Sequence, residues 1–249
     1  MFGGKKWIVV FYIVFVFFSG LSLVFVPNVL SYPYAAEVSI VLILMPVLYS
    51  LHKNLGFKKT LLFVLILASL TLAIEYIALA TSYPYGEFFY NESLSGKING
   101  ILPWTTGLSY LPFLFGAVGV SGLLVKNPFR RVILSAVILV VFDLVLDPGA
   151  VSVGMWGYTT PGVYYGVPFS NFVGWAVSGV FMSAVAVWML RKFPTNKLVS
   201  LSYSFCISIF LWVWIDLLKQ LWVPFVIGVF IIMYLLMIYS KYEKINPTV

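Results

Sequence analysis

Three carboxylic acids lie inside long apolar runs of the sequence, where a charge is expensive. Glu75 stands in the run 60–80, and Asp143 and Asp147 stand near the end of the run 132–147. A charged side chain within a bilayer costs several kcal/mol, about 2.5 to 3.5 on insertion scales. We therefore interpret these three acids as candidate catalytic residues and expect them to meet in one cavity.

The spacing and surroundings of the acids indicate a chemistry. Asp147 follows Asp143 by four positions, so in a helix both face the same side, about 6 Å apart along the axis. A low dielectric, repulsion between carboxylates and the negative end of the helix dipole before Pro148 favour a neutral acid. Such an acid in an apolar pocket can protonate an electron-rich double bond. In the alternative, purely structural interpretation, the acids accept hydrogen bonds from Tyr or Trp and hold helices together.

Aromatic residues make up 18% of the chain, and several lie in the loops beside the acids. Tyr and Trp also form belts at membrane interfaces, so most of them need no further role. Others could stabilise a cation in a dry pocket, by about 0.5 to 2 kcal/mol per ring face. Asn171 could cap a helix or position a water molecule. The predicted substrate-binding residues are Tyr85, Trp104, Trp156, Tyr165, Asn171 and Trp175.

The remaining composition restricts other chemistries. A single His52 and a single Cys206 exclude a His-rich or Cys-ligated metal site, and the sequence has no nucleotide-binding motif. We expect neither a metal nor an organic cofactor. The net charge of +7 is spread over many short loops, which argues against a nucleic-acid partner.

The elements that must position the acids are membrane spans. With 62% hydrophobic and 9% charged residues, the chain has lipid as its solvent. Runs of about 20 apolar residues can cross the hydrocarbon layer as helices. The first run is too long for the apolar part of a signal peptide, so we expect a span there too. We predict an all-α, polytopic integral membrane helix bundle, a single membrane domain over 1–249, with spans near 7–26, 35–51, 60–80, 104–125, 132–147, 171–190, 198–217 and 221–240.

The distribution of basic residues predicts the orientation. Eight spans place all but Lys97 and Lys219 of the 15 Lys and Arg residues on one side. Basic residues collect on the cytoplasmic side, so both termini are predicted to be cytoplasmic in a multi-pass protein of the cell membrane. The two longest connections, 81–103 and 148–170, then lie on the outer side, and loops of this size are usually functional.

Two stretches around the acids carry a family resemblance. One runs from Glu75 to Tyr83-Pro84-Tyr85-Gly86-Glu87-Phe88-Phe89-Tyr90. The more specific one begins at Asp143-Leu-Val-Leu-Asp147-Pro148 and continues through Trp156-Gly-Tyr158, Gly162-Val-Tyr164-Tyr165-Gly166-Val-Pro168 and Asn171-Phe-Val-Gly174-Trp175. Together they resemble the membrane carotenoid 1,2-hydratases, including the archaeal bisanhydrobacterioruberin hydratases.

This resemblance implies hydration of the terminal 1,2 double bond of an acyclic carotenoid end to a tertiary alcohol. Protonation at C2 would leave a cation at C1, which water captures without any cofactor. Asp143 or Asp147 would be the proton donor, Glu75 its partner or the base for the water, and Trp156, Tyr165 and Trp175 the aromatic wall. The partners implied are a lipid-soluble carotenoid, membrane lipids and other enzymes of carotenoid biosynthesis.

Two alternatives remain open from the sequence. A membrane lycopene cyclase would form the same cation and end it by ring closure, which adds no water. A transporter or receptor bundle could also carry acids in its spans. A retinal receptor, however, needs a Lys in mid-span, and every Lys here lies at or near a span end. The mass of the product separates hydration from cyclisation.

Overall fold

The computed structural model describes residues 3–32, 34–94 and 96–245. Within these ranges, eight helical segments are long and apolar enough to cross a membrane: Lys6–Phe25, Ala35–Leu55, Phe57–Thr81, Thr106–Leu124, Pro128–Ser152, Phe169–Lys192, Thr195–Leu218 and Trp222–Tyr242. The predicted all-α, eight-span bundle is confirmed.

Several spans join a regular helix to a shorter helical segment, and short strands lie in the two longest connections. The helices are α1 Gly3–Phe25, η1 Val29–Ser31, α2 Ala35–Leu55, α3 Phe57–Thr81, α4 Thr106–Ser109, α5 Leu111–Leu124, α6 Pro128–Ser152, α7 Phe169–Met189, η2 Leu190–Lys192, η3 Thr195–Ser202, α8 Tyr203–Leu218 and α9 Trp222–Ile245. The strands are β1 Phe88–Tyr90, β2 Lys97–Ile98, β3 Leu102–Pro103 and β4 Trp156–Tyr158.

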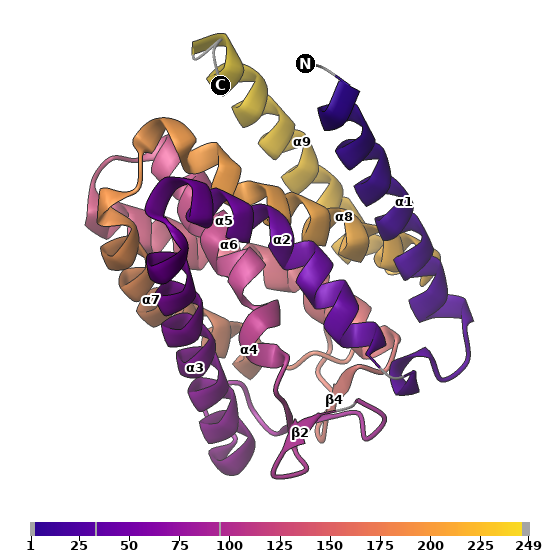
Figure 1. Cartoon of the computed structure of the whole chain (residues 1–249). Coiled ribbons are helices and arrows are strands. Elements are labelled where there is room, and N and C mark those ends of the chain that lie inside the picture. The colour runs from indigo at the N-terminus through magenta and orange to yellow at the C-terminus, as the bar shows by residue number, and fades with distance from the viewer. Residues whose placement is uncertain (1–2, 33, 95, 246–249) are drawn as a thin grey trace.

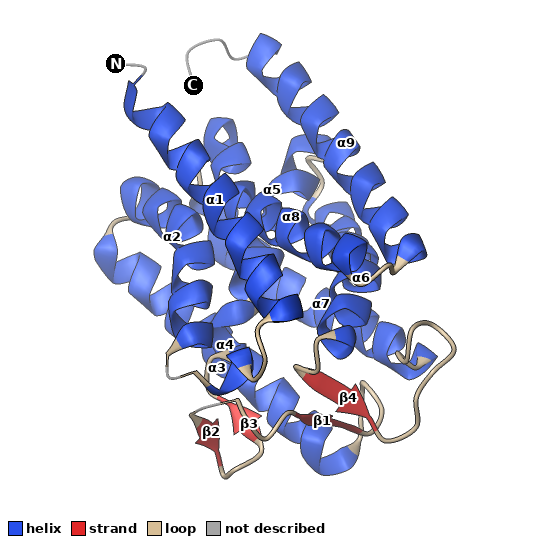
Figure 2. Cartoon of the chain, turned by 90° about the vertical axis from the view of Figure 1, so that its right-hand side faces the viewer, coloured by secondary structure: helices blue, strands red, loops and turns tan. Residues whose placement is uncertain are grey.

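The start of α1 and the end of α9 lie at the same end of the bundle, as an even number of spans requires (Figure 1). The strands gather at the opposite end (Figure 2). Which end faces the cytoplasm stays a prediction from the basic residues. Of those residues, the side chains of Lys5 and Lys244 lie outside the described part of the chain.

The centre of the bundle is α5, in which every residue from Leu111 to Ser121 is buried. Small residues let it approach its neighbours closely, which drives helix association where lipid removes the hydrophobic effect. A Cβ added at Gly116 would overlap the Phe205 side chain, and one at Gly119 would lie 2.9 Å from the Leu198 carbonyl oxygen. The outer helices α1 and α9 instead expose many large apolar side chains, which suits a surface in contact with lipid.

The largest departure from the predicted spans is in α6, which was expected to end before Pro148 and instead continues to Ser152. Proline has no N–H, so it leaves the carbonyl four residues earlier without its helical partner. That carbonyl belongs to Leu144, and the Tyr164 hydroxyl donates a hydrogen bond to it at 2.9 Å. Asp147 therefore lies inside the helix. The predicted contribution of a helix C-terminus directly beside Asp147 is wrong.

We expect Tyr164→Phe to destabilise the bundle, because it removes the donor that satisfies the Leu144 carbonyl. A buried acceptor left without a donor costs about 1–3 kcal/mol. Thermal unfolding in detergent should therefore show a lower midpoint. Tyr165→Phe is the matched control, since the more exposed Tyr165 hydroxyl only accepts a hydrogen bond from the Val223 amide at 3.3 Å. Equal midpoints for the two variants would contradict the role of Tyr164.

A two-stranded antiparallel sheet joins the two long connections. β1 pairs with β4 in the register Phe88 to Tyr158, Phe89 to Gly157 and Tyr90 to Trp156. The pairing is extended on one side by the Asn91 amide, which donates to the Met155 carbonyl at 3.0 Å. The loop after α3 and the loop after α6 are thereby fixed to each other above the ends of their helices.

Candidate active site

The two aspartates of α6 form a buried pair bridged by one amide. Asp143 and Asp147 are both buried, and the Asn171 side-chain nitrogen donates to Oδ2 of each, at 2.8 Å and 2.6 Å. The two carboxyl groups are also within hydrogen-bonding reach of each other. They can therefore share a proton, which relieves the repulsion between neighbouring carboxylates.

Asn171 does not cap a helix, which corrects one of its two predicted roles. The helix α7 begins at Phe169 with Pro168 as its N-cap residue, so Asn171 lies in the first turn. Its side chain points across to α6, and its amide nitrogen donates a hydrogen bond to each aspartate of the pair. A buried carboxyl pair requires such donors, because unsatisfied polar groups are expensive in a low dielectric.

The sheet brings aromatic donors to the same acids. From β4, the Tyr158 hydroxyl donates to Oδ2 of Asp147 at 2.6 Å, and Trp156 also hydrogen-bonds to this carboxyl. Burial, and then the charge of Asp147, raises the pKa of Tyr158 far above its ordinary value. The phenol thus keeps its proton and remains a donor at neutral pH.

Glu75 has an equivalent partner on the neighbouring strand. The Tyr90 hydroxyl, from β1, donates to Oε2 of Glu75 at 3.1 Å. Burial and the charge of Glu75 raise the pKa of Tyr90 well above its ordinary value, so this phenol also stays protonated. Because Tyr90 and Trp156 are partners in the sheet, with ring centroids 6.1 Å apart, one strand pair serves the acids of α3 and α6 together.

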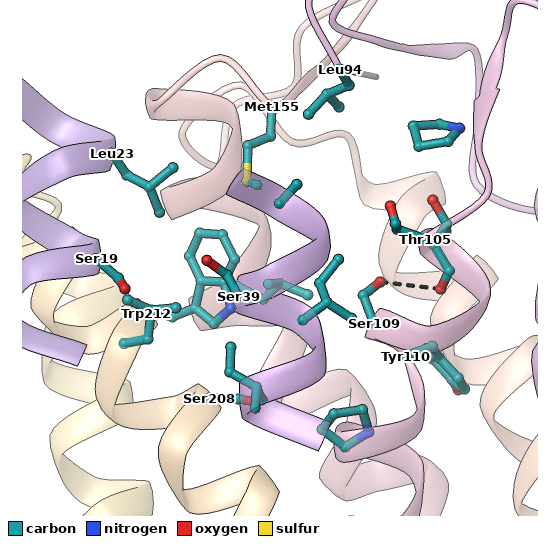
Figure 3. A pocket seen from close by; sticks show the side chains of 18 of the residues that line it. Ser19, Leu23, Ser39, Leu94, Thr105, Ser109, Tyr110, Met155, Ser208 and Trp212 are labelled. Atoms are coloured by element: carbon teal, nitrogen blue, oxygen red, sulfur yellow. Dashed lines mark hydrogen bonds between the residues drawn. The ribbon is translucent and has the colours of Figure 1, made fainter. Parts of the chain in front are cut away.

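These groups surround one end of a cavity of about 760 Å³, a volume typical of ligand sites. Glu75 and Asp147 both line it, whereas Asp143 lies behind Asp147 and Asn171 and is not among the lining residues. Two of the three acids that we expected to meet in one cavity therefore line this cavity. Figure 3 shows Thr105, Ser109 and Tyr110 towards one side of this space and Ser19 and Trp212 towards the other.

The rest of the cavity wall, which we call the apolar arm, comes mainly from three other helices. It is lined by α1 from Phe11 to Leu23, by α2 from Ala35 to Ile43, and by α8 at Ser208, Leu211 and Trp212. Twelve helical steps along α1 correspond to about 18 Å. The arm is mostly apolar with a few serine hydroxyls, so it suits an extended hydrocarbon better than a polar solute.

Four of the six predicted substrate-binding residues line the cavity: Tyr85, Trp156, Asn171 and Trp175. Trp104 and Tyr165 do not line it. The Trp104 indole packs over Gly96 and is 41% exposed. Tyr165 is 36% exposed and lies beside the start of α9 at Val223. Both are surface aromatics of the loop end, a position in which interfacial Trp and Tyr are common.

The sequence reasoning also overlooked a fourth acid in the spans. Asp216 in α8 is fully buried, and neither of its side-chain oxygens has a hydrogen-bond partner among the described residues. One of these oxygens packs against Gly149 of α6. The same cost of charge in lipid that singled out the other acids would have found it. It does not line the cavity.

Comparison with known proteins finds a matching family and a similar protein. Residues 34–235 match a family described as carotenoid biosynthesis protein. A bisanhydrobacterioruberin hydratase from Haloarcula japonica is 34% identical over 183 residues, which cover 65% of this chain and 58% of the relative. The chain thus matches somewhat more than half of that relative's length. No solved structure matches the chain significantly.

Proposed function

The chain belongs to the family of carotenoid biosynthesis proteins, and from this premise we propose that it is an enzyme of the cell membrane that hydrates an acyclic carotenoid end. The observation that carries the proposal is the group of acids at the wall of a large, mostly apolar cavity. A polyene can lie along the arm with its terminal double bond at the acids. The similarity to a protein named as a hydratase supports water as the second substrate.

In the proposed mechanism, Asp147 is the acid that donates a proton to C2 of the terminal double bond. It lines the cavity, whereas Asp143 stands behind it as the partner that shares the proton. Asn171 and Tyr158 hold the Asp147 carboxyl in place through hydrogen bonds. Such positioning is what general acid catalysis requires, and it contributes about 10² to 10⁴ in rate.

The proton transfer leaves a tertiary cation at C1. In an apolar cavity this cation must be stabilised by groups of the protein and not by bulk water. The rings of Tyr90, Trp156 and Trp175 line the acid end of the cavity. An aromatic face attracts a cation by about 0.5 to 2 kcal/mol, more strongly when the cation is desolvated. Water then adds to C1 and loses a proton to a base, for which Glu75 is the remaining acid on the cavity. The net reaction consumes one double bond and one water.

Production of the chain in cells that accumulate an acyclic carotenoid tests the proposal. We expect pigments heavier than the parent by one or two waters, measured by mass spectrometry of extracted carotenoids. Cells carrying Asp147→Asn at equal protein abundance are the control. Pigments of unchanged mass would reject hydration, and a cyclic product of the same mass would indicate a cyclase.

We also predict that the apolar arm binds the polyene, so that filling it discriminates against long substrates. Ser39→Trp places an indole in the arm, and overpacking of this kind costs about 1–3 kcal/mol. Hydration of a full-length carotenoid should fall by about tenfold relative to that of a short acyclic isoprenoid with the same end. Val41→Trp is the matched control, because Val41 is on the same helix, is exposed and does not line the cavity. An equal loss with long and short substrates would contradict this placement.

A further inference from the structure

A second, much smaller cavity lies against the acid end of the main one. About 10 Å³ is available there to the centre of a water molecule, roughly what one ordered water occupies. Five of its lining residues also line the main cavity: Thr71, Glu75, Tyr85, Tyr110 and Trp175. The remaining lining residues are Ile74, Ser178 and Met182. The two cavities are therefore neighbours that share one wall.

Several residues that line this small cavity carry polar groups that a bound water requires. The Tyr110 hydroxyl is buried and has no hydrogen-bond partner among the described residues. The Tyr85 hydroxyl donates to Ser178 Oγ at 2.9 Å, so its oxygen is still able to accept. Thr71 donates to the Leu67 carbonyl and has acceptor capacity left in the same way. With the Glu75 carboxyl, the lining offers the two to four partners that a buried water takes.

The position of the Tyr110 hydroxyl is fixed by its ring. The ring lies 5.6 Å from Trp175 and 6.5 Å from Phe113, measured between centroids. A buried phenol normally finds a hydrogen-bond partner, because leaving it without one costs about 1–3 kcal/mol. Tyr110 lines both cavities, as Glu75 does, and its buried hydroxyl has no partner among the described residues, so this wall is a built site for a small polar ligand.

We propose that the small cavity holds the water that attacks the carotenoid cation, with Tyr110 positioning its oxygen and Glu75 accepting its proton. This rests on the proposed hydratase function. The C1–O bond forms as one O–H bond of the water breaks and its proton passes to Glu75. The other new bond, C2–H, has already formed with the proton from Asp147. The proton on Glu75 later returns through solvent to the aspartate pair, so no oxidant or other reactant is needed.

In this proposal one group donates the proton and other groups position the water. The fate of the cation should therefore depend on which of these groups is removed. A cation that receives no water loses a proton from a neighbouring carbon and becomes an alkene again. In D₂O this futile cycle leaves deuterium in carotenoid that has not been hydrated. Weakening the water site should therefore increase exchange relative to hydration, whereas removing the acid should stop both.

The experiment uses the full chain in membranes with an acyclic carotenoid in D₂O, and measures alcohol and deuterated alkene by mass spectrometry. For Tyr110→Phe we expect about tenfold to hundredfold less alcohol, with deuterated alkene rising relative to alcohol. Glu75→Gln should shift the ratio in the same direction. Asp147→Asn should lose both products.

Tyr239→Phe is the matched control, because it removes a partly buried phenol on α9 that lines neither cavity, and the ratio should not change. A normal yield of alcohol from Tyr110→Phe, or a parallel fall of both products, would overturn the proposed water site. If the unaltered protein formed neither alcohol nor deuterated alkene, the hydratase function itself would fail.

Discussion

Replacing Asp147 with asparagine is expected to reduce carotenoid hydration by about 10² to 10⁴, the usual contribution of a general acid. Asparagine keeps the size of the side chain and an oxygen that can accept from Tyr158 and Asn171. It has no carboxyl proton to transfer to the double bond. The loss should therefore appear in the yield of alcohol while protein abundance and thermal stability remain close to those of the unaltered chain.

Asp143→Asn should cause a smaller loss, because in the proposed mechanism Asp143 acts on the substrate only through Asp147. Asp143 does not line the cavity, and its Oδ1 has no hydrogen-bond partner among the described residues. In that mechanism it shares a proton with the neighbouring acid and keeps that acid neutral. Asp216→Asn is the matched control, since Asp216 is an equally buried acid that does not line the cavity. Full hydration by Asp147→Asn at normal abundance would exclude it as the acid and leave Glu75 as the candidate.

The sequence could predict the features that follow from the free-energy cost of placing polar or charged groups in lipid. Eight apolar runs are sufficient to predict the bundle, because a span must satisfy its own backbone hydrogen bonds. The cost of a charge in lipid singles out Glu75, Asp143 and Asp147 from their positions in the apolar runs alone. The same cost applies to Asp216, so Asp216 was also predictable from its position in an apolar run.

Other parts depend on contacts between segments that are far apart in the sequence. Nothing local to β1 or β4 indicates that these strands pair, yet the pairing carries Tyr90 to Glu75 and Tyr158 to Asp147. The continuation of α6 through Pro148 likewise depends on Tyr164, 20 residues away from the carbonyl that it satisfies. Loop aromatics such as Trp104 are indistinguishable by composition from those that line the cavity, since an interface favours both.

Gly174→Ala is expected to have a large effect although it leaves every functional side chain in place. A Cβ at this position of α7 would overlap the Tyr85 ring and lie 2.8 Å from the Pro84 carbonyl oxygen. A ring can rotate away, but a backbone carbonyl in a tight turn moves only with the whole loop. Overpacking of a buried contact costs about 1–3 kcal/mol, and we expect the upper end of that range here.

The same displacement should also impair hydration, because the turn at Pro84 precedes β1 and carries Tyr85 into the wall of both cavities. We expect a lower unfolding midpoint in detergent together with at least about tenfold less alcohol. Gly179→Ala on the same helix is the matched control. Its added Cβ would meet its nearest neighbours at 3.5 Å, which is ordinary contact, and alanine favours a helix by about 1 kcal/mol over glycine. If both alanine variants hydrated the carotenoid at the normal rate, the close approach of Tyr85 and Pro84 to α7 would have no part in holding the site together.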